Sequence, residues 1–124
     1  MTIKKERGDQ AETLAARHLE RRGMKIIARN HRDRSGELDI IALEGKTLCV
    51  IEVRSRWEPS AYLPEQGLGP GKIKRLYKTT ARLLQKHRLS HLPVRMDLMV
   101  IDWAAGNPEI RFYPASISAG GQSG

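Results

Sequence analysis

Residues 37–55 read ELDIIALEGKTLCVIEVRS, two runs rich in Ile, Leu and Val on either side of the pair Gly45-Lys46. A Gly-X pair between apolar runs favours a two-residue type II′ turn, because glycine readily adopts the positive φ that this turn needs. The segment therefore predicts a hairpin with strands at 37–44 and 47–55.

The length of the turn also predicts how the two strands pair. One face would carry three apolar cross-strand pairs, and the other face would carry two charged pairs and one apolar pair. The pairs on the apolar face are Leu38 with Val53, Ile40 with Ile51 and Ala42 with Cys49. Those on the other face are Glu37 with Arg54, Asp39 with Glu52 and Ile41 with Val50. A slip of one residue would bring charge onto the apolar face, which supports this register. Two carboxylates, Asp39 and Glu52, are therefore expected opposite each other, with Cβ atoms about 4.5 to 5.5 Å apart.

The residues alone leave two explanations for the Asp39–Glu52 pair. Like charges directly opposite on a sheet are destabilising, so either nearby cations such as Arg54 neutralise the pair or a divalent cation binds to it. Carboxylate oxygens suit Mg²⁺ or Mn²⁺. Such an ion could activate a water and hold a phosphate oxygen, as phosphodiester hydrolysis requires. The second explanation predicts a metal-dependent nuclease site.

Three more side chains are candidates for the same site. Arg54 stays protonated at neutral pH, so it can stabilise negative charge on a phosphate but cannot act as the general base. Glu37, its predicted cross-strand partner, would orient it. Glu12 lies on the apolar side of a predicted first helix. It is a candidate second metal ligand or water-bridged partner, and a carboxylate at the solvent edge is the equal alternative.

All of the net charge of +8 comes from one segment, residues 70–95. It holds eight Lys and Arg and no Asp or Glu, whereas the rest of the chain has equal numbers of acidic and basic side chains. Apolar residues at helical spacing predict an amphipathic helix with one cationic face, the footprint of a polyanion-binding surface. A solvated face is the alternative, although such faces usually mix signs. The predicted nucleic-acid contacts are Lys72, Arg75, Lys78, Arg82 and Lys86 in this segment, with Arg32, Arg34 and Arg56 outside it.

The remaining elements follow from periodicity and turn residues. The segment 10–22 has helical spacing, with Asp9 as its N-cap and Gly23 at its end. Strands are expected at 24–29, 94–103 and 109–113, with loops at 30–36 and 56–69. The order helix, strand, hairpin, helix, strand and strand predicts an α/β class with a mixed central sheet flanked by helices.

Length and composition favour one domain at 1–115, followed by a tail at 116–124 that is expected to be disordered. A single cysteine, Cys49, excludes an internal disulfide and a multi-cysteine zinc site. No apolar run is long enough to cross a membrane, and no apolar signal-peptide region follows the polar N-terminus. We therefore expect a cytoplasmic protein with no membrane partner and no small-molecule cofactor.

Several motifs together resemble a known family. They are GDQAE at 8–12, RNHRDRSGELDII at 29–41, IEVRSR at 51–56, KIKRL at 72–76 and RMDLM at 95–99. From Lys4 to about Tyr113, the sequence looks like the YraN-type family of uncharacterised predicted endonucleases. That family is similar to the archaeal Holliday-junction resolvases and to the wider restriction-endonuclease-like fold with its PD-(D/E)xK site.

The resemblance implies a restriction-endonuclease-like fold and a nuclease site that depends on Mg²⁺ or Mn²⁺. Carried over by motif, Asp39 and Glu52 would bind the metal, and Glu12 would match the acid on the first helix. Arg54 would stand where such nucleases usually have Lys, and Lys72 matches a basic position in the second helix. The implied substrate is DNA, including branched DNA such as a four-way junction. A homodimer would suit the two cuts that a junction needs.

Three functions are consistent with these observations. The first is a metal-dependent DNA endonuclease, and the second is a non-catalytic nucleic-acid-binding module with a degenerate active site. The third is a protein-interaction domain whose basic helix binds an acidic partner. The first two predict DNA binding that weakens as salt rises. Only the first predicts metal-dependent cleavage that is lost when Asp39 or Glu52 is replaced by Ala.

Overall fold

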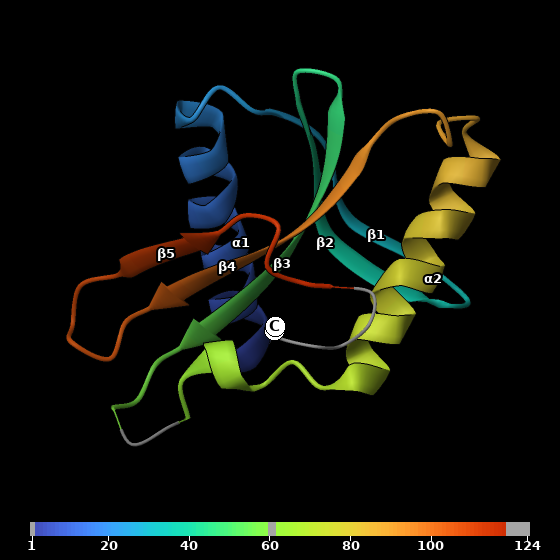
Figure 1. Ribbon diagram of the computed structural model, residues 1–124. Coiled ribbons are helices and arrows are strands. Elements are labelled where there is room, and N and C mark those ends of the chain that lie inside the picture. Colours follow the sequence, from blue (N-terminus) through green and yellow to red (C-terminus); the bar gives the residue numbers. More distant parts are fainter. Residues whose placement is uncertain (1, 60–61, 119–124) are drawn as a thin grey trace.

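Five strands form one mixed sheet in the order β1-β2-β3-β4-β5 (Figure 1). The computed structural model describes residues 2–59 and 62–118. The elements are α1 (Ile3–Arg21), β1 (Lys25–Asp33), β2 (Gly36–Glu44), β3 (Thr47–Arg56), the 3₁₀ turn η1 (Pro64–Gln66), α2 (Pro70–Lys86), β4 (Val94–Asp102) and β5 (Glu109–Tyr113). Strands β3 and β4 are parallel, and the other neighbouring pairs are antiparallel. The predicted α/β class is confirmed, and the arrangement is compatible with a restriction-endonuclease-like fold.

The two helices cover opposite faces of the sheet (Figure 1). On one face, Leu19 of α1 belongs to a buried cluster with Ile51. On the other face, Leu76 and Leu83 of α2 belong to a cluster with Val50. The central strands are therefore buried on both faces, which explains their nearly continuous apolar sequence. Helix α2 is the crossover that connects the parallel strands β3 and β4. Its basic residues are therefore placed beside the sheet.

The central hairpin has the predicted turn and, next to the turn, the predicted register. Gly45 adopts a φ of +59° whereas Lys46 keeps a negative φ, as a type II′ turn requires. The predicted pairs Ile40 with Ile51, Ile41 with Val50 and Ala42 with Cys49 are all present. This part of the fold was predicted correctly because a two-residue turn fixes the pairing of the residues nearest to it.

Farther from the turn, β2 and β3 part. Their ladder ends at Ile40 and Ile51, so the predicted backbone pairs 38–53, 39–52 and 37–54 do not form. Strand β2 stays paired with β1 as far as Gly36, and β3 stays paired with β4 as far as Arg56. Leu38 packs on the α2 face whereas Ile40 packs on the α1 face. The predicted single apolar face through residues 38–42 is therefore wrong.

Helix α1 and strand β1 are both longer than predicted. Helix α1 begins at Ile3 because the side chain of Thr2 accepts a hydrogen bond from the Lys5 N–H at 3.2 Å. Asp9 therefore lies inside the helix, paired with Lys5, and the prediction of Asp9 as N-cap is wrong. Strand β1 runs through most of the predicted 30–36 loop to Asp33, since β2 offers it backbone partners down to Gly36. As an edge strand, β1 tolerates polar residues, which is why its sequence resembles a loop.

The ordered contacts reach beyond residue 115. Ile117 is buried, its N–H donates to the Met96 carbonyl at 3.3 Å, and its carbonyl accepts the Tyr77 hydroxyl at 2.7 Å. The expectation of a disordered tail from 116 is therefore wrong for residues 116–118, and the rest of that tail, 119–124, lies outside the described residues. Within 2–59 and 62–118, no helix has the length and apolar character needed to cross a bilayer.

Candidate active site

Asp39 and Glu52 come together at the point where β2 and β3 part. The Val53 N–H donates a hydrogen bond of 2.9 Å to Asp39 Oδ2, so a side chain of β2 contacts β3 just beyond the last backbone pair. The Asp39 and Glu52 carboxyl groups lie close enough to interact, and the charge of Asp39 raises the pKa of Glu52. The predicted proximity of the two carboxyl groups is thus present, although side-chain contact produces it rather than a continuous ladder.

The Glu52 carboxyl group is buried, and that of Asp39 is partly buried. Glu52 is only 4% exposed. Burial raises the pKa of Asp39, and burial together with the charge of Asp39 raises the pKa of Glu52. A raised carboxyl pKa means that the ionised form is disfavoured in the folded protein. The pair would therefore be stabilised by an additional cation.

Two basic side chains approach Glu52. Lys72, in the first turn of α2, places Nζ 3.4 Å from Glu52 Oε2, and Arg54 places Nη1 3.9 Å from the same oxygen. Lys72 lowers the pKa of both carboxyl groups without cancelling the effect of burial. The helical pattern assigned Lys72 to the outer basic stripe, whereas the structure places it against Glu52. Its match to a basic position of the resembling family was the one available signal for a special role.

Glu12 of α1 lies on the other side of Asp39. Its side chain is buried, and its Oε1 has Arg29 Nε as an ionic neighbour at 3.5 Å. Among the described residues, that oxygen has no hydrogen-bond partner. Burial and the charge of Asp39 raise the pKa of Glu12, which places it within electrostatic reach of the pair. An acceptor that is buried without a hydrogen bond is costly and suits a water or cation that completes the site.

The donor set fits a loosely held divalent ion better than a closed metal site. In the part of the chain that the structure describes, no three His, Cys, Asp or Glu side chains gather as ready-made ligands. Glu12 is thus not brought into one ligand cluster with Asp39 and Glu52. Mg²⁺ commonly binds through one or two carboxylates and keeps its other positions for water and substrate phosphate. Asp39 and Glu52 match that requirement.

Two predicted site residues have structural partners instead. Glu37 forms an ion pair with Arg32 of β1 at 3.1 Å, so the prediction that it orients Arg54 is wrong. The reason is that β2 leaves β3 before Glu37 and remains paired with β1. Arg56 was predicted to contact nucleic acid, but its Nε lies 3.0 Å from Asp102 Oδ2 and its side chain is largely buried. Its charge is used within the fold.

The basic face of α2 is only partly free for a ligand. Arg75, Lys78 and Lys86 are exposed, as predicted. Arg82 forms an ion pair of 3.2 Å with Asp33 of β1. A cavity of about 360 Å³ lies there between the end of β1 and α2, and Arg32, Arg82 and Lys86 contribute to its lining. Arg34 is exposed in the adjacent turn. Three of the predicted loop and helix cations therefore line one cavity, together with Asp33.

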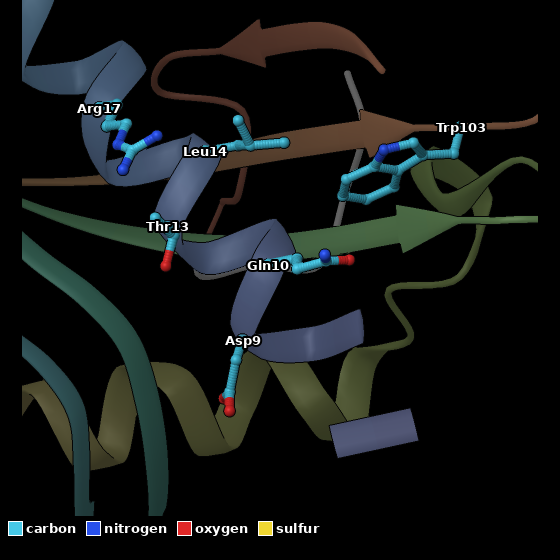
Figure 2. A pocket seen from close by; sticks show the side chains of 6 residues that line it. All are labelled: Asp9, Gln10, Thr13, Leu14, Arg17 and Trp103. Atoms are coloured by element: carbon cyan, nitrogen blue, oxygen red, sulfur yellow. The ribbon is translucent and has the colours of Figure 1, made fainter. Parts of the chain in front are cut away.

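Another cavity of about 400 Å³ lies between α1 and the end of β4. Figure 2 shows Trp103 at one end of it and the side chains of Asp9, Gln10, Thr13, Leu14 and Arg17 along the helix. Trp103 stacks on Trp57, with ring centroids 3.8 Å apart, and Arg7 lies over the ring of Trp57. Trp57 is therefore held between Arg7 and Trp103.

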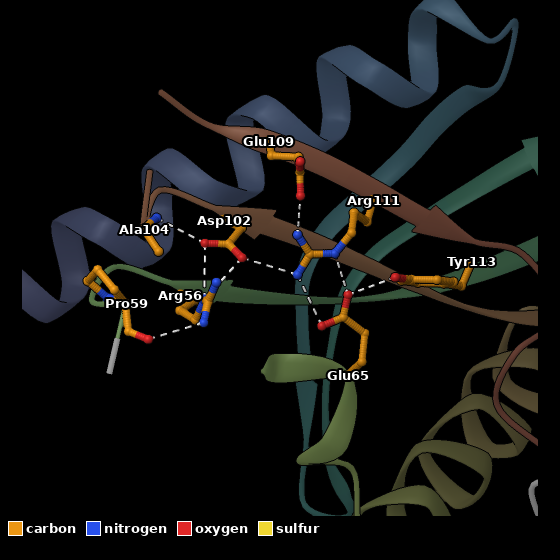
Figure 3. Close-up of polar contacts among 8 residues, drawn as sticks. All are labelled: Arg56, Pro59, Glu65, Asp102, Ala104, Glu109, Arg111 and Tyr113. Atoms are coloured by element: carbon orange, nitrogen blue, oxygen red, sulfur yellow. Dashed lines mark hydrogen bonds and ion pairs between the residues drawn. The ribbon is translucent and has the colours of Figure 1, made fainter. Parts of the chain in front are cut away.

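A second group of charged residues holds the loop next to Arg54. Figure 3 shows Arg111 of β5 in contact with Glu65 of η1, with Asp102 and with Glu109, while Asp102 also binds Arg56. The Tyr113 hydroxyl donates to Glu65 at 2.7 Å. Two residues after Glu65, Gly67 lies against Arg54, because a Cβ on Gly67 would be 2.6 Å from Arg54 Nη2. The network thereby fixes the segment that supports Arg54.

Comparisons with known proteins agree with the motifs. Residues 11–101 match the profile of the uncharacterised protein family UPF0102. The chain is 33% identical over 117 residues to a UPF0102 protein of Anaeromyxobacter dehalogenans, covering 94% of this chain and 87% of the relative. It is 38% identical over 101 residues to a UPF0102 protein of Syntrophus aciditrophicus, covering 82% and 80%. A UPF0102 protein of Dehalococcoides mccartyi is 36% identical over 107 residues, with 86% and 88% covered.

Proposed function

Because the chain belongs to the uncharacterised protein family UPF0102, we propose a function from the site itself: a metal-dependent endonuclease that hydrolyses phosphodiester bonds in DNA. The observation that carries the proposal is the contact of partly buried Asp39 with buried Glu52, a pair whose pKa values are raised although Lys72 and Arg54 lie beside Glu52. Buried carboxyl groups with too little compensating charge are typical of functional sites.

Asp39 and Glu52 would hold a Mg²⁺ or Mn²⁺ ion. When bound, such an ion supplies a Lewis acid for a phosphate oxygen and for water. The fit is supported by the chemistry of the two carboxylates and by Glu12 Oε1, an acceptor with no hydrogen-bond partner in the described residues. Val53 fixes one oxygen of Asp39 through its N–H, which orients this carboxylate toward the proposed ion site.

The basic side chains have a separate task in this proposal. Lys72 and Arg54 stabilise the negative charge that builds up on the scissile phosphate, because fixed cations in a partly buried site act more strongly than they would in water. Arg54 can also contact two phosphate oxygens at once through its planar guanidinium. The motif has Arg54 where nucleases of the resembling fold usually have Lys. The side chain of Lys72 beside Glu52 nevertheless supplies a lysine ammonium group at the site.

The basic surface of α2 and the β1–β2 turn would bind the DNA backbone. Arg75, Lys78 and Lys86 are exposed on the helix, and Arg34 is exposed in the turn. Binding through several phosphates releases counterions, so affinity should fall steeply as salt rises. Branched DNA remains the substrate that we propose from the family resemblance, with two copies of the chain cutting one junction.

Cleavage assays test the proposal directly. Purified wild type is incubated with linear, flapped and four-way-junction DNA in Mg²⁺, in Mn²⁺ and in EDTA, beside Asp39→Asn and Glu52→Gln. Metal-dependent cleavage by the wild type that both variants lose would support the proposal. Absence of cleavage of all three substrates in both metals by a folded wild type that binds DNA would overturn it.

One observation favours a second function, a non-catalytic DNA-binding module. Lys72 already pairs with Glu52 at 3.4 Å, and the described residues hold no three-ligand cluster, so the acidic pair could be a purely structural ion group. This alternative predicts DNA binding with the same affinity in Mg²⁺ and EDTA and no loss of binding in Asp39→Asn. The endonuclease proposal instead predicts tighter binding in Ca²⁺ or Mg²⁺, because the metal bridges the carboxylates and phosphate.

A further inference from the structure

A cavity beside Arg54 is not used by the chemistry proposed above. It has a volume of about 480 Å³. Arg54, Ser55, Gln66 and Gly67 contribute to one part of its lining, and Tyr62 and Leu63 contribute to another. Because Arg54 belongs both to this cavity and to the surroundings of Glu52, anything bound in the cavity would lie next to the scissile phosphate.

Two apolar side chains at this cavity face solvent. Tyr62 is 89% exposed and Leu63 is 42% exposed. Tyr113 is a different case, because its hydroxyl donates a hydrogen bond to Glu65. A single exposed apolar residue needs no explanation, but two in a row that line a cavity next to a basic site indicate a ligand with an apolar surface. Two side chains are too small a patch for a stable protein interface, which needs roughly 800 Å² on each partner.

We propose that this cavity binds the base of an unpaired nucleotide next to the scissile phosphate, with Tyr62 stacking on the base. The inference rests on the proposed nuclease function and adds a substrate class to it. Every base has an aromatic face that stacks on Tyr, and Arg54 is positioned for the adjoining phosphate. Ser55 and Gln66 supply polar groups for the edge of the base. The Ser55 hydroxyl accepts the Trp57 Nε1–H at 3.3 Å and keeps its own proton to donate.

The binding of a base in this cavity selects among DNA structures. In a continuous duplex each base is stacked and paired, and removing it from the helix has a free-energy cost. At a flap, a branch point or a single-stranded end, the base is already unpaired, so that cost is small. The cavity therefore favours DNA with an unpaired nucleotide at the cut over uninterrupted duplex.

One wall of the cavity, at residues 64–67, is held in place before any ligand binds. Glu65 lies between the cavity residues Pro64 and Gln66, and Arg111 binds its carboxylate. Gly67 fits closely against Arg54 because it lacks a side chain. A site that is already ordered loses less entropy on binding, which favours stacking of a single base.

Binding in EDTA tests the inference without any cleavage. The probes are a flapped DNA with 2-aminopurine as the unpaired nucleotide at the branch and a blunt duplex of the same length. Wild type should quench the 2-aminopurine on the flap, because stacking on an aromatic ring quenches its fluorescence. Tyr62→Ala should lose the quenching and bind the flap about 10-fold more weakly, within the range expected for one lost base–aromatic stack. Its affinity for the blunt duplex should stay the same.

Two further variants serve as controls. Tyr62→Phe keeps the ring and should behave as wild type, and Ile27→Ala removes an exposed apolar side chain on β1, outside the cavity. The inference is overturned if Tyr62→Ala quenches as wild type does, or if it weakens duplex and flap binding equally. Because the assay contains no metal, the stacking result stands apart from the cleavage result: a wild type that quenches but never cleaves would contradict the nuclease proposal and retain the base-binding cavity.

Discussion

Two groups of acidic residues in this protein have opposite electrostatics. Around Arg111, the carboxylates of Glu65, Asp102 and Glu109 all contact a guanidinium. The hydrogen bond from Arg111 lowers the pKa of Glu65 to about 2. Asp39 and Glu52 lie against each other, and burial raises the pKa of both although Lys72 and Arg54 approach Glu52. We call the first group the Arg111 network and the second the acidic pair.

The difference between the two groups separates structure from function. In the Arg111 network, opposite charges compensate one another, so the ionised carboxylates stabilise the fold. In the acidic pair, ionisation is unfavourable in the folded protein, so the pair is maintained at a cost to stability. A cost of that kind is characteristic of active sites, where stability and activity are often in conflict. The same residue types therefore have different roles because of the cations around them.

Neutralising the acidic pair should have the largest effect on activity. Asp39→Asn and Glu52→Gln are each expected to lower the cleavage rate by about 10³-fold or more, since a bound metal contributes several kcal/mol of transition-state stabilisation. Both variants should remain folded. The measurement is the single-turnover cleavage rate, with circular dichroism as the check on folding. Full activity in either variant would mean that the acidic pair is not the metal site.

Removing Lys72 should have the next largest effect. Lys72→Met takes away the cation at 3.4 Å from Glu52 and is expected to lower the single-turnover rate about 100-fold, as loss of one fixed transition-state donor does. Lys74→Met is the matched control, because Lys74 is exposed two positions along the same helix. It should change DNA affinity slightly and the rate hardly at all. Equal effects of the two variants would show that Lys72 serves only to bind the backbone.

Breaking the Arg111 network should reduce stability rather than chemistry. Arg111→Met leaves Glu65 and Asp102 without one of their cationic partners and is expected to destabilise the fold by about 1 to 3 kcal/mol. Arg34→Met, at an exposed position of the β1–β2 turn, should stay within about 0.5 kcal/mol of wild type. Urea unfolding measures both. An unchanged unfolding midpoint in Arg111→Met would remove the contrast between the two groups.

The contributions of the two groups to folding stability should change with pH in opposite directions. This is the smallest of the effects predicted here. Glu65 has a lowered pKa in the folded protein, so its contribution is present above the unfolded pKa and is lost as pH falls toward about 2. Glu52 has a raised pKa, so the folded state is favoured while it is protonated and loses stability as pH rises through that pKa. Glu65→Gln should thus melt below wild type at neutral pH, with a difference that shrinks in acid.

Glu52→Gln should show the reverse. It is expected to melt above wild type at about pH 8 and to match it at about pH 5, where Glu52 is largely protonated. Thermal denaturation across this range measures both variants. Addition of Mg²⁺ should raise the melting temperature of wild type at the higher pH and leave Glu52→Gln unchanged. A wild type that becomes more stable from about pH 5 to about pH 8 relative to Glu52→Gln would contradict the charge assignment of the acidic pair.

Much of the fold could be predicted where the signal was local. The predicted bounds 109–113 for β5 are the observed ones, and those of β2 and β3 differ by one residue. The amphipathic pattern located α2, and Ile73, Leu76 and Leu83 are buried as predicted. The start of α1 and the end of β1 were missed because their residues are polar. Thr2 and the backbone of β2 determine them, and neither produces an apolar pattern.

The candidate site was predictable in part. The proximity of Asp39 and Glu52 could be predicted because they lie one residue beyond the last pair of the ladder, Ile40 with Ile51, although the predicted backbone pair itself does not form. The partners of Glu37 and Arg56, which are Arg32 and Asp102, were not predicted, because they come from strands whose pairing the hairpin does not specify. Lys72 was assigned to a surface role, since helical periodicity gives the face of a residue but not the strand residue that it meets.

The type II′ hairpin, the register beside its turn and the segregation of positive charge in α2 all follow from local sequence. These features depend on turn geometry and periodicity, which act over a few residues. Long-range packing, by contrast, makes β2 and β3 part after Ile40 and Ile51, and it places Lys72 against Glu52 and both Arg56 and Arg111 against Asp102. These contacts join residues far apart in the chain, because the packing of α2 and β4 on the sheet determines which charges meet.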